Sequence, residues 1–264
     1  MVDNTRTGAG APRTAPEGPW LVRRERRPEA ASSLYCFTHA GGSPGEYVRW
    51  SDDLPDVQVW AMQLPGRASR RAEPAFTRMR PLVDALLDKV VFEEPFAFFG
   101  HSLGGLVAYE VARALRERGR EQPERLFLSS SPPPPLVHGE APLHQLSGAE
   151  LLPALERRFG ALPEPVRANP ALLEIVLAYY RADIEVFETY DHLPGEPLDR
   201  PITAFAGTEE ADTLHIEGWK AHTSAAFDLG FLPGGHFYLR AERQELLRRV
   251  GEAMPGAESP RGQR

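Results

Sequence analysis

Short apolar runs alternate with longer amphipathic segments along most of the chain. Segments 78–92, 103–119 and 238–253 place apolar residues three or four positions apart, which indicates helices packed on a sheet. The alternation predicts repeated βαβ units, and therefore an α/β domain with a mostly parallel central sheet flanked by helices. The apolar runs with the length and residue types of buried strands are 33–39, 57–62, 95–100, 125–130, 202–207 and 227–232.

The interval between residues 131 and 200 interrupts this rhythm. It opens with "SPPPPL" and contains two helical patterns, at about 147–159 and 170–190. We interpret about 132–200 as an inserted helical lid. The second pattern carries an apolar stripe that either covers a pocket or packs on the core. The stripe consists of Leu172, Leu173, Val176, Leu177, Tyr180, Ile184 and Phe187.

The two ends of the chain lack hydrophobic periodicity. Residues 1–28 are rich in Pro, Gly, Ala and Arg, and residues 255–264 are similar, so both are predicted to be disordered tails. The 264 residues fit one large domain, which we expect at residues 29–254.

Composition narrows the classes of function. Lys and Arg total 30 against 37 Asp and Glu, and a net charge of −7 argues against general nucleic-acid or membrane-surface binding. No run approaches the roughly 18 apolar residues of a membrane span, and the first residues lack the apolar segment of a signal peptide. The single cysteine, Cys36, cannot form an internal disulfide. We therefore expect a cytoplasmic protein.

Two serines satisfy the spacing Gly-x-Ser-x-Gly. Ser102, in "FAFFGHSLGGLVAYEVARAL", lies between a predicted strand and a predicted helix, where flanking glycines allow the strained turn of a nucleophile elbow. The oxyanion hole of such a site uses the N–H of the next residue, and Pro44, which follows Ser43, has none. We predict Ser102 as the nucleophile and the N–H of Leu103 as an oxyanion donor.

The loop around Ser43 has another expected role. The sequence "HAGGSPG" follows the first predicted strand, where the second oxyanion donor is normally supplied. The candidate donor is the N–H of Ala40, and the glycines after it allow a close backbone approach to the substrate.

The expected chain order is nucleophile, acid, then histidine. Of the late histidines, His236 alone lies in a loop directly after a terminal strand, in "FLPGGHFYL", so we predict it as the general base. His215 and His222 lie in a helical pattern and are expected to be surface residues.

The acid should follow the preceding strand, "PITAFAG". Glu209, Glu210, Asp212 and, less well placed, Glu217 are the candidates there. Asp is the residue type used more often, but Glu also serves in triads. The sequence leaves Glu210 and Asp212 as open alternatives.

Together these motifs resemble the type II thioesterases associated with polyketide and nonribosomal peptide synthetases, members of the α/β-hydrolase superfamily. The resemblance implies an α/β-hydrolase fold with a helical lid after its sixth strand. It also implies Ser102 as nucleophile, His236 as base, and Ala40 and Leu103 as oxyanion donors. In the family the acid is usually an Asp three residues after the strand-ending Gly, a register that here falls on Glu210. The matching segments are "FTHAGGSPGEYVRW", "QLPGR", "FFGHSLGGLVAYEVAR", "AGTEEAD", "EGWKAHT" and "LPGGHFYL".

The resemblance implies hydrolysis of acyl thioesters on carrier proteins. An acyl carrier or peptidyl carrier protein would present the chain on its phosphopantetheine arm, and an acyl-enzyme would form and hydrolyse, editing or releasing chains in antibiotic biosynthesis. We expect no cofactor and no metal in the protein itself, and a monomer. The alternatives are a carboxylesterase or lipase for free small esters, and a noncatalytic binding protein on the same fold.

The run "GRASRRAEPAFTRMR", residues 66–80, is rich in arginine. Carrier proteins of these synthetases resemble acidic helical bundles, so this run either steers a carrier or the pantetheine phosphate, or is an ordinary solvated loop. The arginines are Arg67, Arg70, Arg71, Arg78 and Arg80.

Overall fold

The computed structural model describes residues 18–136, 142–160 and 162–256. The remaining parts of the predicted tails and lid lie outside the described residues. A seven-stranded sheet has the order β1-β3-β2-β4-β5-β6-β7. Only β1 runs antiparallel to its neighbour, which confirms the mostly parallel sheet. The strands are β1 (Leu21–Val22), β2 (Ser32–Phe37), β3 (Val57–Met62), β4 (Phe96–His101), β5 (Leu126–Ser129), β6 (Ile202–Gly207) and β7 (Phe227–Leu232).

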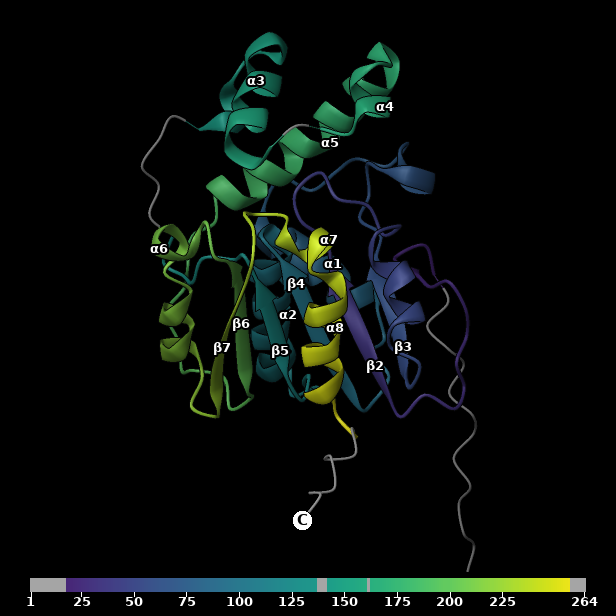
Figure 1. Ribbon diagram of the computed structural model, residues 1–264, viewed down its shortest axis with the longest axis vertical. Helices are drawn as coiled ribbons and strands as arrows, with labels where there is room; N and C mark the ends of the chain where they lie inside the picture. Colours follow the sequence, from purple (N-terminus) through teal and green to yellow (C-terminus); the bar gives the residue numbers. More distant parts are fainter. Residues whose placement is uncertain (1–17, 137–141, 161, 257–264) are drawn as a thin grey trace, which may run out of the picture.

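Helices cover both faces of this sheet (Figure 1). The α-helices are α1 (Met79–Lys89), α2 (Leu103–Glu117), α3 (Gly148–Phe159), α4 (Glu164–Arg167), α5 (Pro170–Glu188), α6 (Ala211–Leu214), α7 (Tyr238–Ala241) and α8 (Arg243–Glu252). The 3-10 helices are η1 (Tyr47–Asp52), η2 (Ala68–Arg70), η3 (Leu143–Gln145) and η4 (Ile216–His222). Within the described residues, none of the helices combines the length and apolar character needed to cross a membrane.

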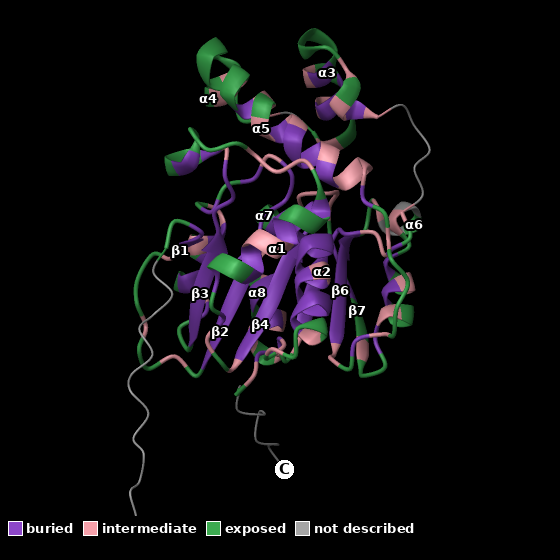
Figure 2. Ribbon diagram, turned by 180° about the vertical axis from the view of Figure 1, so that it is seen from behind, coloured by how far each residue is buried: buried purple, intermediate pink, exposed green. Residues whose placement is uncertain are grey.

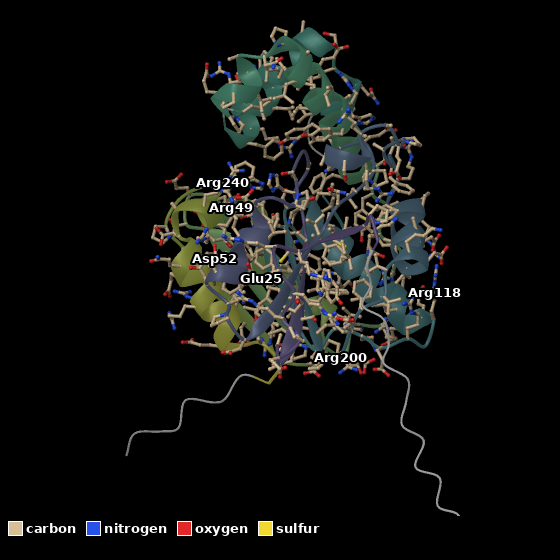
Figure 3. The ribbon with its side chains drawn as sticks, turned by 90° about the vertical axis from the view of Figure 1, so that its right-hand side faces the viewer. Glu25, Arg49, Asp52, Arg118, Arg200 and Arg240 are labelled. Carbon is tan, nitrogen blue, oxygen red and sulfur yellow. The ribbon has the colours of Figure 1, made fainter. Side chains whose placement is uncertain are left out.

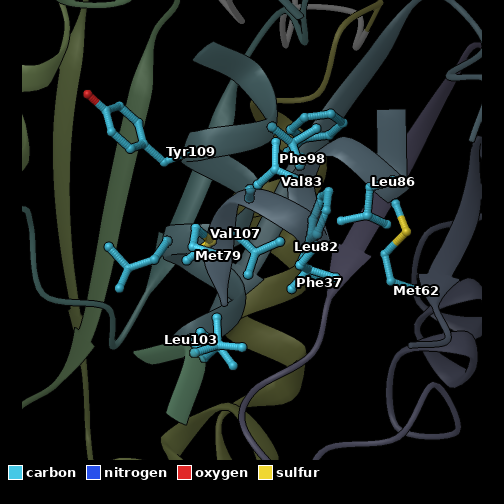
Figure 4. Close-up of a cluster of buried hydrophobic side chains, with 14 of the residues drawn as sticks. Phe37, Met62, Met79, Leu82, Val83, Leu86, Phe98, Leu103, Val107 and Tyr109 are labelled. Atoms are coloured by element: carbon cyan, nitrogen blue, oxygen red, sulfur yellow. The ribbon is translucent and has the colours of Figure 1, made fainter. Parts of the chain in front are cut away.

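Successive side chains of the central strands enter two different hydrophobic clusters. On β4, Phe96 and Phe98 join the cluster formed with α1 and α2, part of which is drawn in Figure 4. Ala97 and Phe99 join the second cluster, with η1 and α8. Because both faces are covered at the centre of the sheet, central strands such as β4 and β5 are mainly apolar instead of alternating with polar residues, as the sequence pattern indicated.

The N-terminal part of the fold begins earlier than expected. Residues 18–28 were assigned to a tail, but Leu21 and Val22 pair with β3, and Trp20 is only 8% exposed. The guanidinium of Arg70 lies 4.0 Å from the centre of the Trp20 ring. A two-residue strand is too short to give a periodic signal, which explains why the pattern missed it.

The lid lies above the carboxyl ends of the strands (Figures 1 and 2). It connects β5 to β6, so the expectation that it follows the sixth strand is wrong for the described sheet, in which it follows the fifth. The apolar stripe of α5 divides along its length. Val176, Tyr180 and Ile184 are buried, whereas Leu172 is 37% exposed. The helix therefore leaves the start of its stripe exposed and packs on the rest of the protein from Val176 onward.

Candidate active site

Ser102 occupies a tight turn between β4 and α2. Its φ of 55° and ψ of −120° are unfavourable for a residue with a side chain, a strain of about 1–3 kcal/mol. A Cβ at Gly100 would lie 2.2 Å from the carbonyl oxygen of Gly104, so the turn requires glycine there. The Ser102 N–H donates to the carbonyl of Ser129 at 2.8 Å, which fixes the turn to β5. The serine thus stands at the carboxyl edge of the sheet, as expected of an elbow.

Glu210 contacts the imidazole of His236. The distance from His236 Nδ1 to Glu210 Oε2 is 2.9 Å, and the other carboxylate oxygen accepts from the Ser130 hydroxyl and, at 3.4 Å, from the Gly207 N–H. Burial alone would raise the pKa of Glu210, but these hydrogen bonds and the charge of His236 outweigh it and hold the pKa below its usual value. An ionised carboxylate only accepts, so His236 Nδ1 carries the proton. The side chain of Asp212 is exposed on α6.

The two loops meet because their backbones approach closely. A Cβ at Gly207 would lie 2.3 Å from the carbonyl oxygen of Gly234 and 2.5 Å from that of Gly235. The N–H of Glu209 donates to the Gly234 carbonyl at 3.1 Å. Glycine at the end of β6 is therefore what lets the acidic turn touch the loop that carries the histidine.

A cavity of 450 Å³ brings these groups together, a volume within the usual range of small-molecule sites. No hydrogen bond joins the Ser102 hydroxyl to His236 in the part of the chain that the structure describes; such bonds are often long in unliganded enzymes. The ring of Phe159, at the end of α3, lies 5.3 Å from that of His236. The cavity is lined by Ala40, Ser102, Leu103, Glu210 and His236 from the core, and by Phe159, Tyr180, Ile184 and Phe187 from the lid.

Two backbone N–H groups are available to an anion at this cavity. Among the described residues, neither the N–H of Ala40 nor that of Leu103 donates a hydrogen bond. Leu103 is also the first residue of the 15-residue helix α2, whose dipole favours negative charge at this end. Both predicted donors therefore lie where they can stabilise an oxyanion beside Ser102.

Two further histidine rings lie beside that of His236, neither of them stacked face to face. The His101 ring lies 5.0 Å from that of His236, and the His39 ring lies 5.8 Å from that of His101. Burial, with smaller effects of Arg240 and His236, lowers the pKa of His39 to about 3. Burial likewise lowers the pKa of His101 well below its usual value. Both rings are therefore neutral at pH 7.

The rival serine lies elsewhere. Ser43 is exposed and lines a second cavity of 290 Å³. Arg240 also lines that cavity and pairs with Glu46 at 3.0 Å; Figure 3 shows Arg240 on the part of the core below the lid.

Among the described residues, no group of three His, Cys, Asp or Glu side chains is arranged to hold a metal ion.

Two expectations about individual residues are wrong. His215 is exposed as predicted, but His222 is partly buried, with its ring nitrogens 3.0 Å from the Tyr109 hydroxyl and 2.8 Å from the Pro134 carbonyl oxygen. In the arginine-rich run, Arg67 and Arg70 are 2% and 4% exposed and cannot meet a carrier protein. Arg67 instead donates to Gly42 and Asp183, which come from distant segments that the local sequence does not reveal. Arg70 donates to the carbonyl of Gln63, seven residues earlier.

Sequence reasoning also missed several groups of the site. Ser130 is one of three consecutive serines, and nothing in that run marks the one that donates to Glu210. Tyr180 was placed on an apolar stripe without a position relative to Ser102. Nothing in the sequence marks Phe159 as a lining residue of the cavity or Asp183 as a partner of the loop after β2, because both contacts depend on how the lid docks on the core.

The chain is similar to a family model, to curated proteins and to solved structures. The model of the thioesterase domain family matches residues 32–254. Linear gramicidin dehydrogenase LgrE of Brevibacillus parabrevis is 37% identical over 238 residues, 86% of this chain and 89% of that protein. Thioesterase PikA5 of Streptomyces venezuelae is 36% identical over 250 residues, covering 91% and 87%. The type II thioesterase BorB from the borrelidin biosynthetic cluster superposes with a TM-score of 0.76 at 32% identity, covering 89% of this chain and 96% of BorB.

Proposed function

Since the chain belongs to the thioesterase domain family, we propose that it hydrolyses acyl thioesters carried on the phosphopantetheine arm of acyl or peptidyl carrier proteins. Ser102 is the nucleophile, His236 the general base and Glu210 the acid in this proposal. The observation that carries it is the Glu210–His236 contact at 2.9 Å, in the same cavity as a serine on a strained elbow.

In the first half of the reaction Ser102 attacks the thioester carbonyl. His236 Nε2 takes the hydroxyl proton as the new C–O bond forms, and the oxyanion accepts from the N–H groups of Ala40 and Leu103. When the oxyanion collapses, the C–S bond breaks, and His236 returns the proton to the departing pantetheine sulfur. The product is an acyl-Ser102 ester and a free pantetheine thiol.

Water completes the cycle. His236 removes a proton from the water that attacks the ester, and then returns it to Ser102 as the carboxylic acid leaves. Glu210 orients the imidazole through Nδ1 and stabilises its cationic form. The lowered pKa of Glu210 suits this task, because a carboxylate that stays ionised keeps its charge opposite the imidazolium.

The apolar lining of the lid supports an acyl substrate. Phe159, Ile184 and Phe187 face the same cavity as Ser102, so an acyl chain can leave water as it binds. A lid whose contribution to the cavity is mainly apolar fits an enzyme that accepts several chains, as editing of stalled intermediates requires.

The names of the similar proteins differ in the activity that they state. PikA5 and BorB are named thioesterases, whereas LgrE is named a dehydrogenase. The site favours the former, because a serine on an elbow beside an imidazole–carboxylate pair serves acyl transfer. Hydride transfer relies on a bound nicotinamide or flavin, and the glycine-rich loop after β2, "HAGGSPG", lacks the G-x-G-x-x-G spacing of dinucleotide sites.

A carboxylesterase would use the same triad, so substrate preference decides between the two. We expect kcat/KM for an acyl-pantetheine thioester, and still more for the acyl-loaded carrier protein, to exceed that for the p-nitrophenyl ester of equal chain length. Stopped-flow detection of thiol and of p-nitrophenol measures both. A higher kcat/KM for the oxygen ester than for both thioesters would favour the esterase.

A further inference from the structure

A buried ion pair joins the lid to the core beside the site. Arg67 Nη2 donates to Asp183 Oδ1 at 2.5 Å, and the two side chains are 2% and 4% exposed. Asp183 belongs to α5 of the lid, whereas Arg67 directly precedes η2 of the core. The ring of Tyr179, also on α5, lies 5.0 Å from the guanidinium carbon. Neither charge touches the triad, so the mechanism above leaves the pair without a role.

Both partners of this pair also hold the backbone after β2. The N–H of Gly41 donates to Asp183 Oδ2 at 2.8 Å, and Arg67 Nη1 donates to the carbonyl of Gly42 at 3.0 Å. A Cβ at Gly41 would lie 2.2 Å from Cδ2 of Tyr180, so the ring packs directly on the loop. The position of the loop is therefore set by α5 and Arg67.

This arrangement determines where the N–H of Ala40 points. Residues 39–42 form a β-turn in which the Gly42 N–H donates to the His39 carbonyl at 2.9 Å, and the φ of +71° at Gly41 is typical of a type II turn. In a trans peptide the carbonyl and the N–H point in opposite directions. With the His39 carbonyl directed at Gly42, the Ala40 N–H points the other way, and Ala40 lines the active-site cavity.

We infer that Asp183, together with Arg67, is a positioning residue for the oxyanion hole. Asp183 accepts from the Gly41 N–H and so holds the turn in the form that presents the Ala40 N–H to the oxyanion. Because the Gly41 N–H is already bonded, the Ala40 N–H is the donor that the turn offers to the substrate. The inference rests on the proposed function. Helix α5 then has two roles: it covers the cavity and it helps to position the oxyanion donor. A preorganised donor is effective only if the residues that hold it are themselves fixed.

Two double variants test this role. Removing one charge alone would leave its partner buried and uncompensated, so both carry Arg67→Met. Arg67→Met/Asp183→Asn keeps an oxygen acceptor for the Gly41 N–H, whereas Arg67→Met/Asp183→Leu has nearly the same size and no acceptor. With acyl-pantetheine as substrate, we expect kcat of the Leu variant to be about 10²-fold below that of the Asn variant, the usual effect of one lost oxyanion donor, at similar KM and melting temperature.

The control is Glu185→Gln, which breaks the exposed ion pair between the same helix and Arg78 and should leave kcat unchanged. Equal kcat in two folded double variants contradicts the inference alone, while an inactive wild type contradicts the proposed function. If the Leu variant does not fold, Arg67→Met/Asp183→Ala, which also lacks an acceptor for the Gly41 N–H, takes its place. A kcat at least about tenfold below that of the Asn variant at unchanged KM is expected, whereas a kcat equal to that of the Asn variant would overturn the inference.

Discussion

At Glu210 the reach of a single side chain determines which acid meets the imidazole. Glu210 is three residues after the strand-ending Gly207, where its carboxylate accepts from His236, Ser130 and the Gly207 N–H. Asp212 is two residues further on and exposed. The sequence could restrict the acid to this turn but could not choose between Glu210 and Asp212, because the choice depends on where the turn begins and on Ser130, which follows β5.

Replacing Ser102 by alanine tests the nucleophile. We expect Ser102→Ala to lower kcat by about 10⁵- to 10⁶-fold, the range for loss of a triad nucleophile, with an unchanged melting temperature. Hydrolysis of acyl-pantetheine, followed by released thiol, measures this. Ser43→Ala is the matched control, because Ser43 shares the Gly-x-Ser-x-Gly spacing but is exposed; a comparable loss in both variants would contradict the assignment.

The acid is tested in the same assay by two conservative changes. Glu210→Gln keeps the shape of the side chain but removes the charge that stabilises the imidazolium, so kcat should fall by about 10³- to 10⁴-fold. Asp212→Asn should leave kcat near wild type. The reverse pattern would show that the acidic turn rearranges to use Asp212 in the working enzyme.

The buried histidines make stability depend on pH. The pKa of His39 is lowered to about 3 from 6.5, so below pH 6.5 the unfolded chain binds a proton that the folded protein does not. Stability is therefore lost as the pH falls below 6.5, by about 1.4 kcal/mol per pH unit for each such group. Urea unfolding at pH 7 and pH 5 measures the loss, and His39→Gln should reduce it. A stability that is equal at both pH values, or higher at pH 5, would contradict the burial of neutral rings.

Among the elements, the strands and crossover helices were the part that the pattern could predict. Their apolar spacing is a local property, and α1, α2 and α5 begin and end within three residues of the expected bounds. The pattern could not predict the two-residue strand β1 or the strand after which the lid begins. The first depends on pairing with β3, and both depend on how distant segments assemble. His222 was misplaced for the same reason: its partners, Tyr109 and Pro134, come from other segments.

Adding a methyl group at Gly207 tests whether the turn that carries Glu210 must approach the loop that carries His236 closely. Gly207→Ala should push the backbone of Gly234 and Gly235 away, costing about 1–3 kcal/mol of stability, and should lower kcat at least tenfold by separating Glu210 from His236. Thermal unfolding and acyl-pantetheine hydrolysis measure the two effects. Gly148→Ala is the control, since nothing lies within 4 Å of a Cβ there; equal effects of both changes would mean that crowding at Gly207 is unimportant.

On the scale of the whole molecule, one sheet edge assembles the site from segments far apart in the chain. Ala40, Ser102, Glu210 and His236 follow β2, β4, β6 and β7, and parallel strands bring their carboxyl ends to the same edge. This explains why a sequence pattern alone could bring Ser102 and His236 to the same edge of the sheet. The lid lies above the cavity, and its Asp183 accepts a hydrogen bond from the Gly41 N–H in the loop after β2 (Figure 2). The docking of the lid follows from tertiary contacts that no local pattern encodes.

Trapping the acyl-enzyme is the most direct measurement of the central claim, that Ser102 accepts an acyl chain from a carrier-bound thioester. The enzyme is mixed with an acyl-loaded carrier protein, quenched with acid within the first turnover, digested and analysed by mass spectrometry. The account predicts the acyl group on the peptide that contains Ser102, and more of it in Glu210→Gln if deacylation slows further than acylation. Hydrolysis of the carrier thioester by wild type with the acyl group on another residue, or undiminished hydrolysis by Ser102→Ala, would contradict it.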